Sequence, residues 1–221
     1  GAGMSAESGI QTFRESNGLW EEYNIHDVAT PDAWLANPDL VTDFYNQRRK
    51  QIINAEPNDA HKAIADLQNS AEVQVITQNI DDLHERAGSQ NVLHLHGNIR
   101  YAKSSGPNSD RELFRVKGTD LSENDLCPSG FRLRPHVVWF GETVPMMGKA
   151  IQIMGQSTHF IVIGSSLQVY PAANLITHCP SGARKWIIDP NVQEINNIGH
   201  FTLIKQSAVE GIKTVLKEIR L

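Results

Sequence analysis

Short runs of apolar and β-branched residues recur along the chain and predict the strands of a sheet. They lie at 73–76, 92–95, 136–140, 160–163, 185–188 and 201–204. Runs of this length, bounded by turn formers, are typical of buried strands. Segments with apolar residues at helical spacing separate them, at 38–56, 58–67, 147–155, 171–178 and from 207 onward. Strands that alternate with helices favour an α/β fold around a parallel sheet.

Residues 101–132 interrupt this alternation, because they hold few apolar residues and many turn formers. They predict a small lobe inserted into a single domain that spans 1–221. The large lobe then covers about 1–100 and 133–221, and part of 14–56 covers the site. The side chains expected to pack the small lobe are Leu113, Phe114, Leu126 and Phe131.

The segment 77–98 places polar residues at the ends of two predicted strands. Asn79 and Asp81 follow the first strand, and His96 closes the second. A short helix between them is expected to end at Gly88, because glycine is a common C-terminal cap. Open α/β sheets bind ligands at the carboxyl ends of their strands, so a functional site is predicted here.

The first six residues, GAGMSA, have the G-x-G-x-x-A spacing of a dinucleotide-binding turn. Gly1 would allow the tight turn, Gly3 the approach of a pyrophosphate, and Ala6 the close packing of the helix. Ser5 and Ser8 add hydroxyl donors near the helix N-terminus, where the dipole favours phosphate. A strand normally feeds such a turn, so we expect one to precede the sequence shown.

Composition narrows the classes of function. The formal net charge is −5 and the basic residues are scattered, which disfavours nucleic acid as a partner. No apolar run approaches the ~20 residues of a membrane span, and no signal peptide is visible. Cys127 and Cys179 are the only cysteines, and two isolated thiols favour a reducing, cytoplasmic location.

Five strings occur in an order and spacing that resemble the sirtuins, which are NAD-dependent protein-lysine deacylases. They are GAGMSAESGIQTFR, TQNIDDLHERAG, HLHGN, LRPHVVWFGE and GSSLQVYPAA. The similarity covers nearly the whole chain and is weakest in 101–132 and after Trp186. It implies a Rossmann-like parallel sheet with helices on both faces and a small inserted lobe. It also implies NAD as co-substrate and acylated-lysine proteins as substrates, with neither nucleic acid nor membrane as a partner.

The resemblance assigns roles to individual residues. Asn79 and His96 would be catalytic, with the His96 imidazole as general base toward a ribose hydroxyl. Asp81 would accept a hydrogen bond from the nicotinamide carboxamide, and Phe13 would exclude water from the ribose. The residues that would bind NAD are Gly1, Ala2, Gly3, Ser5, Glu7, Thr12, Phe13, Arg14, Trp20, Gln78, Asn79, Ile80, Asp81, His96, Gly164, Ser165, Ser166, Asp189, Asn191 and Ala208.

Two of these positions depart from the family pattern. Thr12 stands where many sirtuins carry aspartate. Asp189 belongs to the string Ile188-Asp189-Pro190-Asn191, where the family usually has an asparagine-led string. An acid at a strand end can bind ribose hydroxyls, so Asp189 is expected to substitute for that string. Ala208 would lie behind the adenine.

Tyr45 and Arg48 resemble the Tyr-x-x-Arg pair with which class III sirtuins, bacterial ones included, bind acidic acyl groups. Positions i and i+3 share a helix face, where an arginine fork and a tyrosine hydroxyl can both donate to a carboxylate. Arg49 points roughly 100° away on a helix and is expected to be solvated. The substrate-binding residues implied by the resemblance are Tyr45, Arg48, Val138, Phe140, Gly141, Glu142, Val169 and Tyr170.

Most sirtuins hold a structural zinc with two pairs of cysteines in the small lobe. The first pair is absent here, and of the second only Cys127 remains, with Gly130 in the partner position. One thiolate cannot supply a tetrahedral zinc site, and His94, His96 and His136 are assigned to core strands. We therefore expect no zinc.

The activity implied by the resemblance is removal of succinyl and malonyl groups, and of acetyl groups as well. Nicotinamide would leave NAD, the acyl oxygen would attack the ribose, and 2′-O-acyl-ADP-ribose and free lysine would result. Two alternatives are a protein mono-ADP-ribosyltransferase and a non-catalytic module that binds NAD or ADP-ribose. Tyr45 with Arg48 disfavours the first, and His96 with Asn79 and Asp81 disfavours the second. Between the two strand ends that carry Asp81 and His96, four further polar residues are expected to support the fold and to take no part in catalysis. They are Asp82, His84, Glu85 and Arg86.

Overall fold

The computed structural model of the chain describes residues 1–10, 23–107, 112–192 and 200–219. Its helices are α1 (Gly3–Ala6), α3 (Ile25–Val28), α4 (Pro31–Ala36), α5 (Pro38–Asn54), α6 (Asp59–Leu67), α7 (Leu83–Arg86), α8 (Met147–Met154), the 3-10 helix η1 (Ala172–His178) and α9 (Ala208–Glu218). Its strands are β1 (Val75–Thr77), β2 (Val92–His94), β3 (Gly97–Ser104), β4 (Leu113–Arg115), β5 (Leu133–Val137), β6 (His159–Ile163), β7 (Arg184–Ile188) and β8 (Thr202–Ile204). No described helix combines the length and apolar character needed to cross a membrane.

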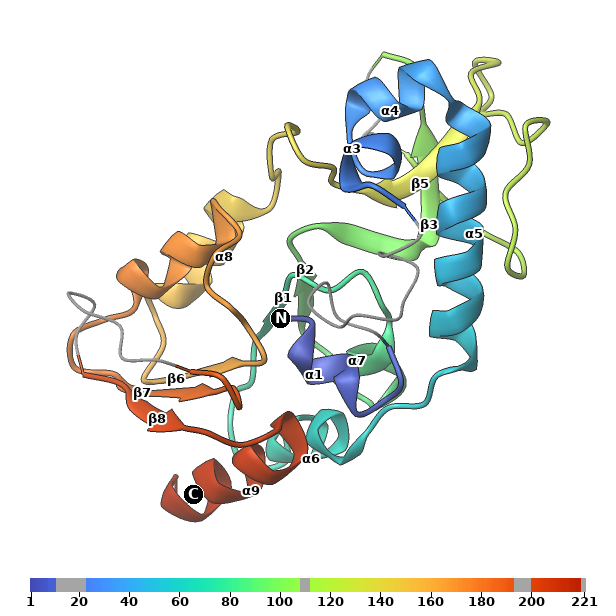
Figure 1. Cartoon of the computed structure of the whole chain (residues 1–221). Helices are drawn as coiled ribbons and strands as arrows, with labels where there is room; N and C mark the ends of the chain where they lie inside the picture. The colour runs from blue at the N-terminus through green and yellow to red at the C-terminus, as the bar shows by residue number, and fades with distance from the viewer. Residues whose placement is uncertain (11–22, 108–111, 193–199, 220–221) are drawn as a thin grey trace.

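Figure 1 shows two groups of elements on either side of a central segment. One group contains the parallel sheet β6–β7–β8 with α8 and α9, and the other the antiparallel sheet β4–β3–β5 beside α3, α4 and α5. The parallel pair β1–β2, with α1 and α7, lies between them. The carboxyl ends of the parallel strands therefore face the antiparallel group.

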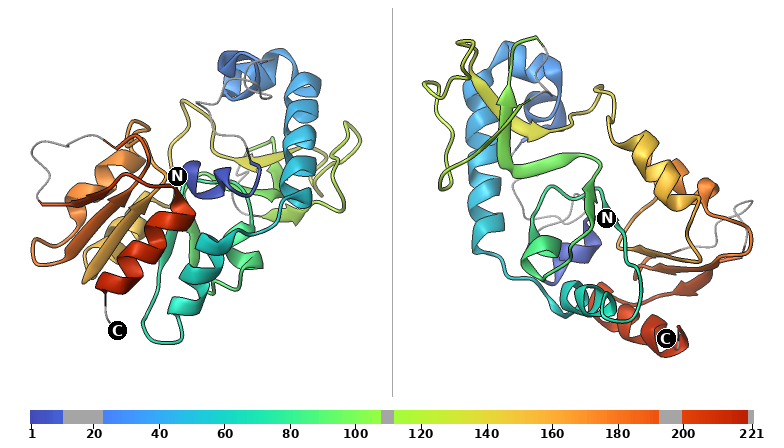
Figure 2. Two further views of the ribbon diagram at one scale, coloured as in Figure 1. Left: turned by 60° about the horizontal axis from the view of Figure 1, so that its bottom comes forward. Right: turned by 180° about the vertical axis from the view of Figure 1, so that it is seen from behind.

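Helices cover both faces of the sheet β6–β7–β8, as β7 illustrates. Its side chains alternate, so that Trp186 and Ile188 pack with Ile212 of α9, whereas Ile187 packs with Ile176 of η1. Figure 2 shows α9 lying along one face of this sheet. The predicted α/β fold with parallel strands and covering helices is confirmed.

Capping residues place the starts of two helices where the sequence predicts them. The side-chain oxygen of Asn58 accepts from the backbone N–H of Ala60 at 3.0 Å and begins α6. Ser207 accepts from the N–H of Glu210 at 3.4 Å and begins α9. Such caps satisfy orphan N–H groups of the first turn, and they depend on neighbouring residues alone.

The strand predicted at 136–140 is wrong in position and in type. β5 ends at Val137, and it pairs antiparallel with β3, a strand that the apolar pattern does not predict. β3 reads GNIRYAKS, in which lysine and arginine interrupt the apolar alternation. The antiparallel sheet also extends beyond 101–132 at both ends, because β3 starts at Gly97 and β5 runs on to Val137.

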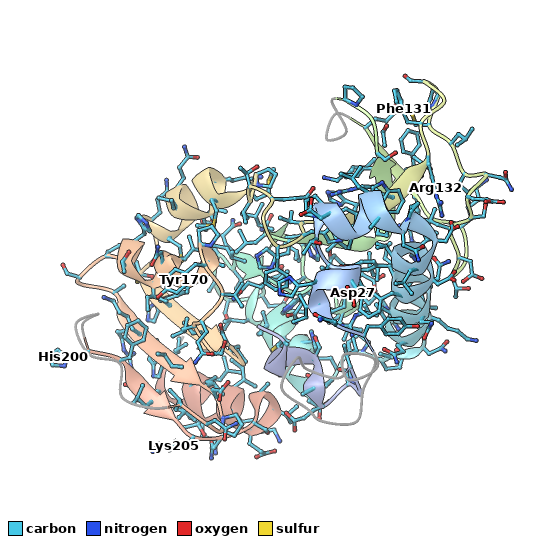
Figure 3. All side chains as sticks on the ribbon, turned by 45° about the horizontal axis from the view of Figure 1, so that its top comes forward. Asp27, Phe131, Arg132, Tyr170, His200 and Lys205 are labelled. Carbon is cyan, nitrogen blue, oxygen red and sulfur yellow. The ribbon has the colours of Figure 1, made fainter. Side chains whose placement is uncertain are left out.

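The expected packing of the small lobe is also wrong for most of the residues proposed. Leu113, Leu126 and Phe131 are exposed by 44%, 54% and 44%, and Figure 3 shows Phe131 at the outer tip of the lobe. These side chains lie in or beside short polar segments at the surface of the lobe, where the described residues cover them only in part. The lobe is packed instead by Ala102, Val116, Leu121, Cys127 and Leu133, with Phe114 partly buried against them.

Arg49 is fully buried, so its expected solvation is wrong. Its Nε donates to the carbonyl of Ile99 at 2.8 Å. One terminal nitrogen donates to Asn46 Oδ1 at 2.7 Å and to the carbonyl of Thr119 at 2.8 Å. The antiparallel lobe covers this face of α5, which the helix alone could not reveal.

Candidate active site

A cavity of about 710 Å³ lies at the carboxyl ends of β1, β6 and β7, between the start of α1 and the inner face of α5. Every predicted site residue in the described ranges lines it, although these residues come from nine separate segments of sequence. They are Gly1, Ala2, Gly3, Ser5, Glu7, Tyr45, Arg48, Gln78, Asn79, Ile80, Asp81, His96, Val138, Phe140, Gly141, Glu142, Gly164, Ser165, Ser166, Val169, Tyr170, Asp189, Asn191 and Ala208. Thr12, Phe13, Arg14 and Trp20 lie outside the described residues.

His96 has a ring orientation suited to proton transfer. Its Nδ1 lies 3.1 Å from the carbonyl oxygen of Gln78. A carbonyl only accepts, so Nδ1 carries the proton and Nε2 keeps its lone pair. Burial lowers the pKa of His96 below its ordinary value, and the bond to Gln78 opposes this in part. The ring is therefore neutral at pH 7, as a general base must be.

Ser5 joins Asn79 to Asp81 beneath the cavity. Its hydroxyl donates to Asp81 Oδ2 at 2.9 Å and accepts from Asn79 Nδ2 at 3.1 Å. The other carboxylate oxygen of Asp81 accepts from the N–H of Leu83 at 3.2 Å. Burial raises the pKa of Asp81, whereas the bonds from Leu83 and Ser5 lower it. The single hydroxyl proton of Ser5 is thus used within the protein, in a bond to Asp81 that the sequence did not indicate.

Two glycines allow the start of α1 to meet the end of β6. The N–H of Gly3 donates to the carbonyl of Gly164 at 3.0 Å. A Cβ on Gly3 would lie 2.8 Å from the Cα of Gly164, which leaves no room for a side chain. Ser165 follows directly, and its hydroxyl accepts from Gln78 Nε2 at 3.3 Å. This edge of the cavity is consequently lined by backbone and small polar groups, a surface suited to phosphate.

Two predicted cofactor-binding carboxylates organise backbone beside the cavity. Glu7 accepts from the hydroxyl of Ser207 at 3.1 Å and from the N–H of Val209 at 2.9 Å, which holds the start of α9. Asp189 accepts from the N–H of Asn191 at 2.8 Å and shapes the turn after β7. Ala208 lies between the two groups that Glu7 binds, so its small side chain is held against the cavity.

Tyr45 and Arg48 project from α5 into the apolar part of the cavity and are 3% and 6% exposed. The indole Nε1 of Trp139 donates to the hydroxyl of Tyr45 at 3.1 Å. Arg134 lies over that indole, with Cζ 3.7 Å from the ring centroid, and its NH2 nitrogen lies 2.8 Å from Glu142 Oε1. Trp139 is a functional candidate that the sequence did not single out. The string LRPHVVWFGE contained it, but nothing local indicated a contact 94 residues away.

The residues that line this cavity fit NAD. The glycine and serine edge suits a pyrophosphate, Asp189 offers a carboxylate that can accept from ribose hydroxyls, and Asp81 and Asn79 offer an acceptor and an amide for a carboxamide. Within the described ranges, no group of three or more His, Cys, Asp or Glu side chains could hold a metal ion. The expected absence of zinc stays a prediction.

Comparison with known proteins agrees with this geometry. The Sir2 family model matches residues 1–171. An NAD-dependent protein deacylase from Helicobacter pylori is 46% identical over 219 residues, which is 99% of this chain and 94% of that protein. A mutant Sir2 homologue in complex with ADP-ribose aligns with a TM-score of 0.88 at 36% identity, covering 99% of this chain and 89% of that one. A Sir2 homologue in complex with NAD aligns with a TM-score of 0.86 at 38% identity, covering 99% and 86%.

Proposed function

Because the chain belongs to the Sir2 family and is an NAD-dependent protein deacylase, we propose that it removes succinyl and malonyl groups from lysine side chains. Acetyl groups would be removed as well. The products would be free lysine, nicotinamide and 2′-O-acyl-ADP-ribose.

One observation carries the acyl preference: a buried guanidinium lies in the same cavity as His96. Burial lowers the pKa of Arg48, and attraction to Tyr45 and Asp81 raises it in part. An arginine stays charged in proteins, and its planar guanidinium can donate two parallel hydrogen bonds to one carboxylate. The carboxylate of a succinyl or malonyl group would be such an acceptor in this cavity.

Trp139 supports the role of Tyr45 by fixing the direction of its hydroxyl. The tyrosine oxygen accepts from the indole Nε1, so its own proton remains available to a second acceptor. Burial raises the pKa of Tyr45, and that phenol therefore stays protonated at physiological pH. Tyr45 and Arg48 together would offer donors from two sides to one acyl carboxylate.

The remaining roles follow from the same cavity. When bound, NAD supplies nicotinamide as a leaving group and ADP-ribose as the acceptor of the acyl group. His96 would take a proton from a ribose hydroxyl at Nε2, the nitrogen left free by Gln78. Asp81 would accept a hydrogen bond from the carboxamide of nicotinamide. Asn79, which Ser5 links to Asp81, would help to hold the nicotinamide ring in place.

The acyl-lysine peptide would bind as an added strand between 141–142 and 168–170. The carboxylate of Glu142 already accepts from Arg134 and from the N–H of Trp139. Glu142 would therefore contact the peptide through its backbone. Binding through backbone hydrogen bonds would give little selectivity for the peptide sequence. Val138 and Phe140 would line the path of the acyl-lysine side chain.

Replacement of Arg48 by methionine tests the acyl preference. With NAD and matched succinyl-, malonyl- and acetyl-lysine peptides, Arg48→Met should lower kcat/KM for the two acidic peptides roughly ten- to a hundredfold. A hydrogen bond to a charged group contributes about 1.5–3 kcal/mol, which gives this range. The acetyl-lysine peptide should change little, because it has no carboxylate to lose.

Two controls accompany this test. Lys50→Met removes the same charge from the exposed face of α5 and should leave all three rates unchanged. His96→Tyr should abolish turnover of every peptide. An equal loss on all three peptides in Arg48→Met would refute the acyl preference and leave the deacylase activity standing.

A further inference from the structure

Four successive carbonyl groups at the end of β1 are held by the neighbouring segment. The carbonyl of Thr77 accepts from the N–H of Leu95 at 2.8 Å, and that of Ile80 accepts from the N–H of Ile99 at 2.9 Å. The two carbonyls between them receive histidine rings instead. His96 Nδ1 lies 3.1 Å from the carbonyl of Gln78, and His94 Nδ1 lies 3.0 Å from that of Asn79.

His94 is held from behind by a carboxylate. Its Nε2 lies 2.7 Å from Glu85 Oε1, at the end of α7. Both ring nitrogens therefore face acceptors, an arrangement that favours the doubly protonated imidazolium. Asn98 Nδ2 lies farther from Nε2, at 3.3 Å, and the amide oxygen of Asn98 is already occupied by the N–H of Arg100. Glu85 is thus the main partner of Nε2.

The surroundings favour the charged ring. Burial lowers the pKa of His94. Three partners raise it by more than burial lowers it, so the net shift is upward: the hydrogen bond and charge of Glu85, the Asn79 carbonyl and the charge of Asp81. The pKa of Glu85 is correspondingly lowered, since the contact with His94 outweighs burial. His84 of α7 is the other titratable ring that interacts with His94. Burial and the repulsion of neighbouring charges lower the pKa of His84 to about 3, so His84 adds no charge at neutral pH.

His94 does not line the cavity, whereas Asn79, Ile80 and Asp81 do. We propose that His94 and Glu85 are a positioning pair for the deacylase reaction: the charged ring holds the Asn79 carbonyl and keeps the side chains of Asn79 and Asp81 directed at the NAD site. A neutral imidazole has a single N–H and can satisfy only one of its two acceptors. The pair therefore loosens when His94 loses its proton.

Deprotonation of His94 should weaken this pair at alkaline pH. The pKa of His94 is raised, so the pair is intact below that pKa and weakens as the pH rises through it. The KM for NAD should then increase on the alkaline side. His96 acts in the opposite sense, because its pKa is lowered and it must be neutral to accept a proton. Its protonation should reduce kcat on the acid side.

Glu85→Gln tests the proposal, because it keeps an oxygen acceptor for Nε2 and removes only the charge. The kcat and the KM for NAD are measured with an acetyl-lysine peptide between pH 5.5 and 9.5. The alkaline rise in KM should move to lower pH, while the acid limb of kcat should stay in place. Glu72→Gln, an exposed carboxylate on the segment before β1, should shift neither limb.

Two substitutions of His94 complete the test. His94→Gln can still donate to the Asn79 carbonyl but cannot titrate, so its KM should lose the alkaline rise. His94→Leu donates nothing, and its KM for NAD should be roughly tenfold higher at every pH, as expected for one lost hydrogen bond. A Glu85→Gln profile that coincides with wild type would overturn the proposal. So would variants that lower the unfolding temperature and reduce kcat without any change in KM.

Discussion

Ser5 makes contacts that its place in the sequence did not indicate. Its position in a glycine-rich turn suggested a phosphate donor, yet its hydroxyl joins Asp81 and Asn79, which are 76 and 74 residues away. The side chain is 1% exposed, so both partners would be left without this bond if it were removed. A short polar residue beside the cavity can thus act by holding other residues that line it.

Ser5→Ala should therefore raise the KM for NAD and lower kcat/KM roughly tenfold, because a buried polar group that loses its partner costs about 1–3 kcal/mol. Steady-state kinetics with NAD as the varied substrate would measure this. Ser8→Ala is the matched control, since the Ser8 hydroxyl has no hydrogen-bond partner among the described residues. If both variants have the KM and kcat/KM of the wild type, the link through Ser5 does not contribute to NAD binding or turnover.

At the scale of elements, α6 and α7 meet through two buried histidines. The rings of His61 and His84 lie 4.8 Å apart between centroids, and the residues are 0% and 5% exposed. Burial lowers the pKa of His61 to about 4 and that of His84 to about 3. Asn58, the cap of α6, contacts the His61 ring and donates to the carbonyl of Met4 in α1. Through Asn58 and Met4, the neutral histidine pair therefore supports the glycine-rich turn at the start of α1.

The stability of the protein should fall as the pH decreases from about 6.5 toward 4. The unfolded chain binds protons at both histidines in this window and the native state does not, so the free energy of unfolding drops by up to about 1.4 kcal/mol per pH unit for each ring. Urea denaturation at pH 7.5, 6.5 and 5.5 would measure the slope. His84→Phe keeps an aromatic ring and removes one titration, so its slope should be shallower. An unchanged slope would count against the neutral pair.

At the scale of the whole molecule, Arg49 connects parts that the sequence places far apart. It binds β3 through Ile99 and the loop after β4 through Thr119. These contacts attach the antiparallel lobe to α5, and another face of the same helix presents Tyr45 and Arg48 to the cavity. The position of Tyr45 and Arg48 relative to the rest of the cavity thus depends on a buried cation that does not line it.

Arg49→Met should lower the free energy of unfolding by at least about 2 kcal/mol, because two buried carbonyls lose their donor. Chemical denaturation compared with Lys50→Met would show it, since that exposed neighbour should change stability by no more than about 0.5 kcal/mol. Equal stability of the two variants would mean that water replaces the guanidinium at low cost.

Local patterns were sufficient for much of the fold. The alternation of strands and helices and the starts of α6 and α9 depend on residues a few positions apart, so they could be predicted. β3 and the shift of β5 could not, because an antiparallel pair is stabilised by its partner strand and its own apolar alternation is weak.

The sequence by itself determined the family and the composition of the cavity, because residue types at fixed spacings carry the chemistry of the NAD site. Only the tertiary structure decided the contacts that hold those residues in place. Ser5 beneath Asp81, Trp139 against Tyr45, and the burial of Arg49 each join segments distant in the chain. Such contacts arise from packing in three dimensions, where burial and hydrogen-bond satisfaction are set by whichever segments meet.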